Sequence, residues 1–253
     1  MNTRSSPRIF CPSALLQGES LELSPEAARH VQVLRLQPGD ELRLFNGRWN
    51  PGAANPGEFV ATIEHMGRRE VRVKIERHLA LEREARRGVH LAVGMPANER
   101  MDWLVEKAAE LGVASIQPLM TERSVLRLNR ERAQKKLVHW QNVAIAACEQ
   151  CGGNRVPLIH EVIGFAAWAE APAARTGARL LLSLRAGVPG IHQALAELDG
   201  ADAELSLLSG PEGGLTESEL ATARSLGFVD VTLGPRVLRA ETAALAALAA
   251  VLV

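Results

Sequence analysis

The sequence predicts a small β-barrel at the N-terminus, followed by an α/β domain that is built on a parallel sheet. In the first 80 or so residues, short segments alternate apolar and polar side chains, as half-buried strands do. Beyond residue 88, candidate strands and helices follow one another in turn, which is typical of a parallel sheet covered by helices on both faces. Residues 79–88 (LALEREARRG) are rich in charge and end in Gly88, so we interpret them as a linker. The predicted domains are therefore residues 1–78 and 89–253.

The first domain begins with one clear helix signal. Ser24 is a suitable N-cap and Pro25 a suitable first helical residue, so we expect a helix to about Leu34. Leu42 and Leu44 alternate with polar neighbours after a Pro-Gly-Asp turn, as in a strand. The expected strands are residues 41–45, 59–65 and 70–77, and the turn formers of residues 46–57 (NGRWNPGAANPG) predict a mobile surface loop.

The second domain shows the alternation of strands and helices throughout. We expect strands at residues 89–93, 115–119, 179–184, 204–209 and 229–233. We expect helices at residues 99–111, 130–151, 191–198, 217–226 and 240–253. The apolar run at residues 242–253 is too short and too rich in alanine to span a bilayer, so it predicts a buried helix.

The formal net charge of zero hides an uneven distribution. Residues 1–88 hold 14 basic and 11 acidic groups, residues 89–160 hold 9 and 7, and residues 161–253 hold 6 and 11, which gives +3, +2 and −5. Among the basic residues, 25 are arginines and four are lysines. Arginine binds phosphate with two nitrogens and stacks on bases, which suits an RNA partner. A compositional preference of the source genome would explain the same excess.

Composition also narrows the class of protein and its location. The apolar fraction of 47% and the charged fraction of 23% exclude a disordered chain. Three cysteines (Cys11, Cys148 and Cys151) are too few for a disulfide scaffold and favour a reducing compartment. The first ten residues contain no apolar segment of a secretory signal. We therefore expect a cytoplasmic protein with no membrane partner.

The most informative segment is residues 205–219 (LSLLSGPEGGLTESE). An apolar strand runs into Gly-Pro-Glu-Gly-Gly, and Thr216 with Glu219 then forms a capping box that starts a helix. Glycines at the carboxyl end of a strand let a ligand approach the backbone, and ligands bind at this edge of open α/β sheets. The alternative is a tight turn without a ligand. The segment matches neither a P-loop nor the spaced-glycine dinucleotide fingerprint.

Residues 233–242 (LGPRVLRAET) repeat this plan, with a strand end, a Gly-Pro turn and a helix start. Glu241 in the first turn of that helix complements the helix dipole, which is one explanation for its presence. Two Gly-Pro exits in one sheet favour a shared pocket.

Two further clusters carry less information. Cys148 and Cys151 lack the second pair of ligands that a zinc site needs, so we interpret both as structural and expect no metal. Six cations lie within residues 122–136, and they form either a solvated helix face or a surface that follows an RNA backbone. They are Arg123, Arg127, Arg130, Arg132, Lys135 and Lys136.

A series of short motifs runs along the chain, namely Arg8-Ile9-Phe10, His30 with Val33-Leu34-Arg35, Phe45-Asn46-Gly47, Glu110-Leu111-Gly112-Val113, Cys148-Glu149-Gln150-Cys151-Gly152 with Asn154-Arg155-Val156-Pro157, Gly210-Pro211-Glu212-Gly213-Gly214, and Leu233-Gly234-Pro235-Arg236-Val237-Leu238-Arg239. Together these motifs resemble the RsmE family of bacterial 16S rRNA uracil-N3 methyltransferases. The resemblance runs in order along nearly the whole chain. It departs from the family pattern at Ala240, where threonine is more usual, and in the length of the loop at residues 46–57.

The resemblance implies a PUA-like barrel, then a SPOUT-type methyltransferase domain with a trefoil knot near the C-terminus. It also implies a homodimer with the knot helices at the interface, and S-adenosylmethionine held in the knot by three loops. Those loops would comprise Leu182, Ser183 and Leu184, then Gly210, Pro211, Glu212, Gly213 and Gly214, and finally Leu233, Gly234, Val237 and Leu238.

The implied reaction methylates N3 of a uridine in the 16S rRNA of the small ribosomal subunit. N3 must lose its proton, and negative charge then spreads onto the flanking carbonyl groups. We expect Arg239 to stabilise that charge, and Glu241 or Glu212 to accept the proton. Alternatives are a SPOUT enzyme for another RNA position, such as a ribose 2′-hydroxyl, and a non-catalytic ribosome assembly factor. Expected RNA contacts are Arg8, Phe10, His30, Arg35, Arg123 and Arg155.

Overall fold

The computed structural model describes residues 6–47, 57–171, 177–198 and 204–253. The central part of the loop expected at residues 46–57 therefore lies outside the described residues. By its internal contacts the chain divides into two units. Unit 1 comprises Met1–Glu84 with Ile145–Val156, and unit 2 comprises Ala85–Ala144 with Pro157–Val253.

Unit 1 is built on a five-stranded sheet with the order β1-β3-β4-β5-β2. Neighbouring strands are antiparallel, except that β1 runs parallel to β3. The three longer strands and the helix confirm the sequence prediction, whereas the two three-residue edge strands were not predicted. The elements are β1 (Arg8–Phe10), β2 (Ser20–Glu22), α1 (Pro25–Val33), β3 (Glu41–Phe45), β4 (Glu58–Met66) and β5 (Val71–Leu79).

The helix α1 begins as its sequence predicts. The Ser24 side chain accepts a hydrogen bond from the Ala27 amide at 3.2 Å, and Pro25 is the first helical residue. The helix buries Ala27, Ala28 and Val31 in the apolar core of unit 1, against the inward-facing residues of the sheet. This single apolar face fixes α1 on the sheet.

A buried carboxylate ties the strands of unit 1 together. Glu58, at the start of β4, is fully buried and forms ion pairs with Arg8, with Arg43 at 3.0 Å and with Arg83 at 2.6 Å. Burial alone would raise the pKa of this carboxyl, but the hydrogen bonds and charges of the three arginines outweigh burial and lower the pKa below its ordinary value. Glu58 is therefore ionised, and its negative charge compensates the positive charge of the surrounding arginines.

The segment Ile145–Val156 belongs to unit 1 although it is distant in sequence. Glu149 accepts a hydrogen bond from the Phe10 amide at 2.9 Å, and Asn154 donates to the Leu81 carbonyl at 2.6 Å. The Val156 amide donates to the Gly47 carbonyl at 3.1 Å. Much of the Cys-Glu-Gln-Cys motif and the residues after it therefore serve to complete unit 1.

Unit 2 contains a parallel sheet with the order β12-β10-β11-β6-β7-β8, and β9 also pairs with β7. Every pairing in it is parallel, which confirms the prediction from the alternating pattern. The two strands expected at residues 179–184 and 229–233 end two residues early, where the chain turns into loops. The strands are β6 (Val89–Gly94), β7 (Ser115–Met120), β8 (Leu158–Ile159), β9 (Ile163–Gly164), β10 (Ala178–Leu182), β11 (Leu205–Ser209) and β12 (Val229–Val231).

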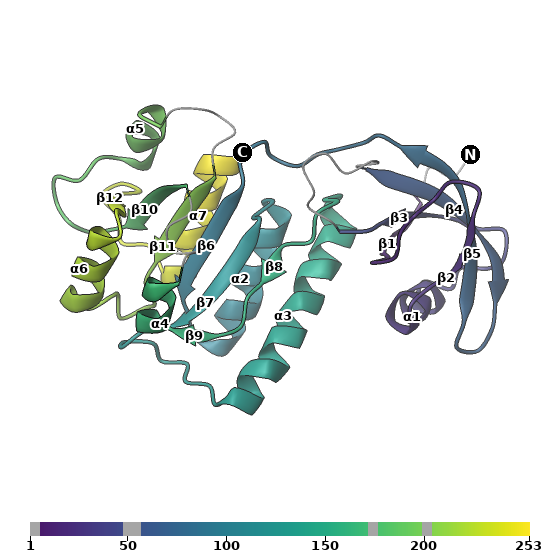
Figure 1. The fold of residues 1–253 in the computed structure, drawn as a ribbon, viewed down its shortest axis with the longest axis horizontal. Coiled ribbons are helices and arrows are strands. Elements are labelled where there is room, and N and C mark those ends of the chain that lie inside the picture. The colour runs from purple at the N-terminus through teal and green to yellow at the C-terminus, as the bar shows by residue number, and fades with distance from the viewer. Residues whose placement is uncertain (1–5, 48–56, 172–176, 199–203) are drawn as a thin grey trace. The chain divides into compact units, whose positions relative to one another are not determined.

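Helices cover both faces of this sheet, with α4 and α6 in front and α2 and α7 behind in the view of Figure 1. The α4 and α6 side holds an apolar cluster with Phe165, Trp168 and Phe228. The helix α7 packs against α2 and against β6 and β11. The helices are α2 (Asn98–Glu110), α3 (Arg130–Cys151), α4 (Phe165–Glu170), α5 (Ile191–Ala196), α6 (Glu217–Ser225) and α7 (Ala240–Leu252).

Residues 229–232, which precede the C-terminal helix, lie between two other segments of the chain. β12 pairs with β10 on one side, and the Ser183 amide donates to the Val231 carbonyl at 2.9 Å. On the other side, the Thr232 amide donates to the Pro189 carbonyl, and the Ile191 amide donates to the Thr232 carbonyl. Residues 229–232 therefore lie within the turn of chain that connects β10 to α5, and α7 then carries the chain back to β6.

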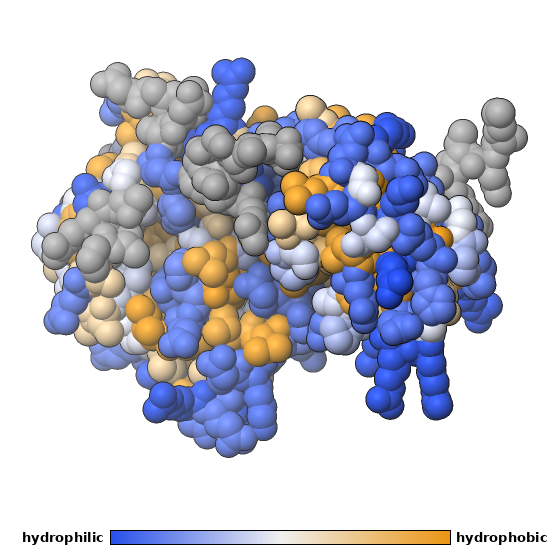
Figure 2. Space-filling view, turned by 45° about the vertical axis from the view of Figure 1, so that its right-hand side comes forward, coloured by the Kyte–Doolittle hydropathy of each residue, from blue (hydrophilic) through white to orange (hydrophobic). Residues whose placement is uncertain are grey.

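The face of the molecule shown in Figure 2 is largely polar. Hydrophilic residues cover most of the face shown in Figure 2, and hydrophobic residues form small groups between them. None of the helices in the described ranges has both the length and the apolar character that a membrane-crossing helix needs.

Candidate active site

A cavity of about 1020 Å³ lies in unit 2, between the loops that follow β10, β11 and β12. These loops leave the carboxyl ends of adjacent parallel strands, which is where ligands bind in open α/β sheets. All the residues expected to hold the cofactor line this one cavity. The lining comprises residues 182–185, 209–215, 231–234 and 236–240, together with Glu217, Leu220, Arg224 and Ala243.

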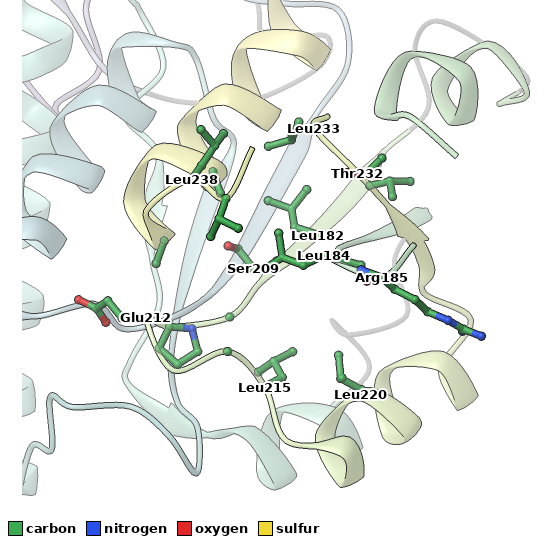
Figure 3. A pocket seen from close by; sticks show the side chains of 18 of the residues that line it. Leu182, Leu184, Arg185, Ser209, Glu212, Leu215, Leu220, Thr232, Leu233 and Leu238 are labelled. Carbon is green, nitrogen blue, oxygen red and sulfur yellow. Dashed lines mark hydrogen bonds between the residues drawn. The ribbon is translucent and has the colours of Figure 1, made fainter. Parts of the chain in front are cut away.

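The cavity wall combines apolar side chains with bare backbone. Figure 3 shows the Glu212 carboxylate at one end of the cavity and the Arg185 side chain at the opposite end. Gly214 and Gly234 have φ angles of +68° and +114°, which L side chains rarely adopt, so glycine is required at both turns. Leucine side chains surround the space between the loops, namely Leu182, Leu184, Leu215, Leu220, Leu233 and Leu238.

The Gly-Pro-Glu-Gly-Gly loop is packed tightly from behind by the end of β6. A Cβ atom on Gly94 would lie 2.5 Å from Pro211 Cδ and 2.7 Å from the Pro211 nitrogen. No real Cβ contact is that short, so β6 must carry a glycine where the loop crosses it. The position of this loop is therefore set by the sheet itself.

Glu212 connects the same loop to the start of α2. Its Oε1 atom accepts hydrogen bonds from the Ala97 amide and from Arg100 Nη1, both at 3.1 Å. Ala97 is the N-cap of α2 and has no side-chain cap of its own, so Glu212 provides the negative charge that this helix end favours. Glu212 thus lines the cavity and also anchors the loop.

Glu241 lies outside the cavity wall. Its residue is 6% exposed, and its Oε1 atom is 3.7 Å from Arg100 Nε. Within the described ranges, its buried Oε2 atom has no hydrogen-bond partner. Arg100 therefore joins the two carboxylates expected near the reaction. No local sequence pattern indicated this role of Arg100, because its contact with Glu212 spans 112 residues.

Arg239 and Arg236 line the cavity and are exposed, as is Arg185 on the opposite loop. Arg239 is the N-cap residue of α7, where its extended backbone leaves the side chain outside the helix. Three exposed guanidinium groups around one cavity provide phosphate- and carbonyl-binding groups beside the cofactor loops. These three arginines lie in the segment of the chain with a net negative charge. The charge distribution along the sequence therefore did not predict a group of cations here.

The residues expected to contact RNA occupy varied settings. Arg8 is largely buried and donates to the Gly153 carbonyl at 2.7 Å and to Asn154 Oδ1 at 3.0 Å, besides its ion pair with Glu58. Phe10 packs on Phe45, with ring centroids 5.8 Å apart. Arg35 is exposed just after α1.

The other three expected RNA contacts also have protein partners. His30 Nδ1 is 3.0 Å from Glu149 Oε2, and Arg155 Nη2 is 3.5 Å from Glu82 Oε2. Arg123 is exposed and donates to the Gly213 carbonyl at 3.2 Å. No group of His, Cys, Asp and Glu side chains suited to a metal ion occurs in the described residues.

The two cysteines of the Cys-Glu-Gln-Cys motif end α3. Cys148 is buried, and burial together with the nearby Cys151 raises the pKa of its thiol. A thiol with a raised pKa is protonated at neutral pH and is a poor nucleophile.

Comparisons with known proteins agree with this arrangement. The family model described as an RNA methyltransferase domain matches residues 83–252, and one described as an RNA methyltransferase PUA domain matches residues 23–54. The ribosomal RNA small subunit methyltransferase E of Buchnera aphidicola (subspecies Schizaphis graminum) is 29% identical over 96% of this chain and 94% of its own.

Two solved structures are similar over almost their whole length. A protein of Legionella pneumophila in complex with the cofactor SAM is 38% identical, with a TM-score of 0.86 over 97% of this chain and 96% of that one. A ribosomal RNA small subunit methyltransferase E from Neisseria gonorrhoeae bound to S-adenosylmethionine is 34% identical, with a TM-score of 0.84 over the same shares. These similarities confirm the fold class that the sequence predicts.

Proposed function

Because the chain belongs to the ribosomal RNA small subunit methyltransferase E family, we propose that it transfers a methyl group from S-adenosylmethionine to N3 of a uridine in 16S rRNA. One observation supports this proposal most. Three cofactor loops of the expected composition surround one cavity, and exposed arginines stand on its wall.

The residues present fit S-adenosylmethionine. The volume of about 1020 Å³ accommodates a ligand of that size. Leucine side chains suit the adenine ring, and backbone bare of side chains at Gly210, Gly213 and Gly214 suits the polar edges of the ligand. When bound, S-adenosylmethionine supplies an electrophilic methyl group on a sulfonium sulfur.

The chain's own residues then have two tasks at the uracil. Uracil N3 carries a proton, and it lies on the base-pairing edge, so the base must be unpaired and swung out. Arg239 places a permanent positive charge on the cavity wall, where it stabilises the negative charge that spreads onto the uracil carbonyls. Of the two candidate proton acceptors, Glu212 lines the cavity and Glu241 does not. We therefore assign to Glu212 the role of accepting the N3 proton.

Arg239→Ala tests this assignment. We expect the variant to lose methylation of 16S rRNA by at least about a hundredfold, as removal of a single transition-state charge donor does. Cofactor affinity by calorimetry should remain within about twofold. Arg236→Ala removes another exposed arginine from the same wall and should lose much less activity than Arg239→Ala. Equal losses of activity in the two variants would indicate that any positive charge on the wall has the same effect. That result would contradict a specific role for Arg239.

The partners follow from the same proposal. The PUA-like unit 1 would contribute RNA affinity through its exposed cations, including Arg35. We further propose that the enzyme acts in the cytoplasm on the small ribosomal subunit or its rRNA. We also propose that it acts as a homodimer through the apolar helix α7.

A further inference from the structure

The turn between β7 and α3 contacts one of the three cofactor loops, residues 210–215 (hereafter the cofactor loop), from outside the cavity. Thr121 and Ser124 close this turn with their own hydrogen bonds, the Thr121 amide donating to Ser124 Oγ at 3.0 Å. The two hydroxyl groups lie 2.9 Å apart, and both residues are buried. Residues 122 and 123 are therefore held at the tip of a rigid turn.

Arg123 extends from this tip to the loop that holds Gly213. Its Nη1 atom donates to the Gly213 carbonyl at 3.2 Å and approaches the Leu215 carbonyl at 3.5 Å. A Cβ atom on Gly213 would lie 3.0 Å from Arg123 Cβ, so the two segments are already in close contact. Both carbonyl contacts come from this one Nη1 nitrogen, whose two N–H donors have fixed directions in the plane of the guanidinium, whereas the three donors of an ammonium group are not held in a plane.

A second contact joins the same two segments. The Glu219 carboxylate is buried, and its Oε1 atom accepts from the Glu122 amide at 2.9 Å. Its Oε2 atom accepts from the Thr216 amide at 2.9 Å and thereby completes the capping box of α6. One carboxylate thus fixes both the start of α6 and the tip of the turn.

These contacts determine how the peptide groups of the loop are oriented. In the peptide between Gly213 and Gly214, the carbonyl accepts from Arg123 and the amide donates to the Pro211 carbonyl at 2.8 Å. In the peptide between Leu215 and Thr216, the carbonyl is directed at Arg123 and the amide donates to Glu219. Both peptides are held at each end, so the shape of the loop depends on the turn outside it.

We propose that Arg123 is a positioning residue for the cofactor loop and acts through the Gly213 and Leu215 carbonyls. This assignment rests on the proposed function, because it presumes that the loop binds S-adenosylmethionine. It differs from the expectation that Arg123 contacts RNA. The two roles make opposite predictions for a substitution that keeps the charge.

The test compares four variants by calorimetric titration with S-adenosylmethionine and by steady-state methylation of 16S rRNA. Arg123→Lys keeps the charge but loses the planar guanidinium, and Arg123→Ala loses both. We expect the dissociation constant for S-adenosylmethionine and its KM to rise about tenfold in both variants. The kcat at saturating cofactor should stay within about twofold of the wild-type value. A loss of folded protein would instead lower the apparent kcat and leave KM unchanged.

Arg132→Ala is the matched control, because Arg132 is an exposed cation of the same basic segment, and within the described residues its side chain makes no hydrogen bond to the loop. It should leave cofactor affinity unchanged. In Gly213→Ala the added Cβ would lie 3.0 Å from Arg123 Cβ, and this variant should also bind the cofactor more weakly.

Wild-type cofactor affinity in Arg123→Ala would overturn the proposal. Weakened RNA binding with unchanged cofactor affinity would do so too and would assign Arg123 to RNA. Failure of the unaltered protein to bind S-adenosylmethionine would instead count against the proposed function.

Discussion

Gly94→Ala should weaken cofactor binding although Gly94 does not line the cavity. The added Cβ would lie 2.5 Å and 2.7 Å from two atoms of Pro211, whereas ordinary contacts begin near 3.4 Å. The overlap of roughly 0.7 to 0.9 Å involves the backbone and a proline ring, so the loop must move. Overpacking of this kind costs typically about 1–3 kcal/mol.

We expect this free energy to appear as a displacement of the Gly-Pro-Glu-Gly-Gly loop from the shape that binds the cofactor. If all of it opposes binding, the dissociation constant for S-adenosylmethionine rises roughly 5- to 150-fold. Isothermal calorimetry measures the dissociation constant, and thermal unfolding measures any loss of folded protein. Gly164→Ala is the matched control, because a Cβ atom there meets nothing within 4 Å. Wild-type affinity in Gly94→Ala would refute the inference that β6 sets the position of the loop.

Two further predictions concern stability. Glu58→Gln should cost about 3–5 kcal/mol of unfolding free energy in urea, because three arginines lose their buried partner. The folded-state pKa of Glu58 is lowered, so its contribution is present above the unfolded pKa and disappears as the pH falls through the folded value. Unfolding free energy should therefore decline on acidification below about pH 5 in the wild type and decline less in Glu58→Gln; identical profiles would contradict this. Thr216→Ala should cost about 1 kcal/mol, since the capping box of α6 loses its acceptor, and a urea titration that shows no loss would argue against that role.

Local patterns in the sequence predicted a large part of the fold. Ser24 before Pro25 and Thr216 before Glu219 marked two helix starts, because a cap depends only on residues a few positions apart. Five strands of unit 2 and their parallel arrangement followed from the alternation of elements, whereas the two-residue strands β8 and β9 and the short helix α4 were not predicted. In contrast, β1 and β2 contain three residues each, which is too short for a period of two to be recognised.

The candidate site divides in the same way. The glycine turns at residues 210–214 and at residue 234 predicted two of the three cofactor loops, because glycine is needed where φ is positive or backbone is closely approached. The third loop, at Leu182–Leu184, came from the family resemblance alone. Its residues carry no turn or charge signal of their own.

Contacts between distant residues could not be predicted from one sequence. Arg100 meets Glu212 across 112 positions, and Arg123 meets Gly213 across 90. Arg8 likewise resembled an RNA-binding residue, and only its burial against Glu58 and Asn154 shows the partners it has in the fold. The role of a charged side chain depends on its partners, which the local sequence does not contain.

The most direct test of the account is to identify the methylated nucleoside. The protein is incubated with labelled S-adenosylmethionine and with undermethylated small ribosomal subunits or free 16S rRNA, and the product is digested and mapped by mass spectrometry. We expect 3-methyluridine at a single position of 16S rRNA. A methyl group on a ribose 2′-oxygen, or no incorporation by a protein that binds the cofactor, would contradict it.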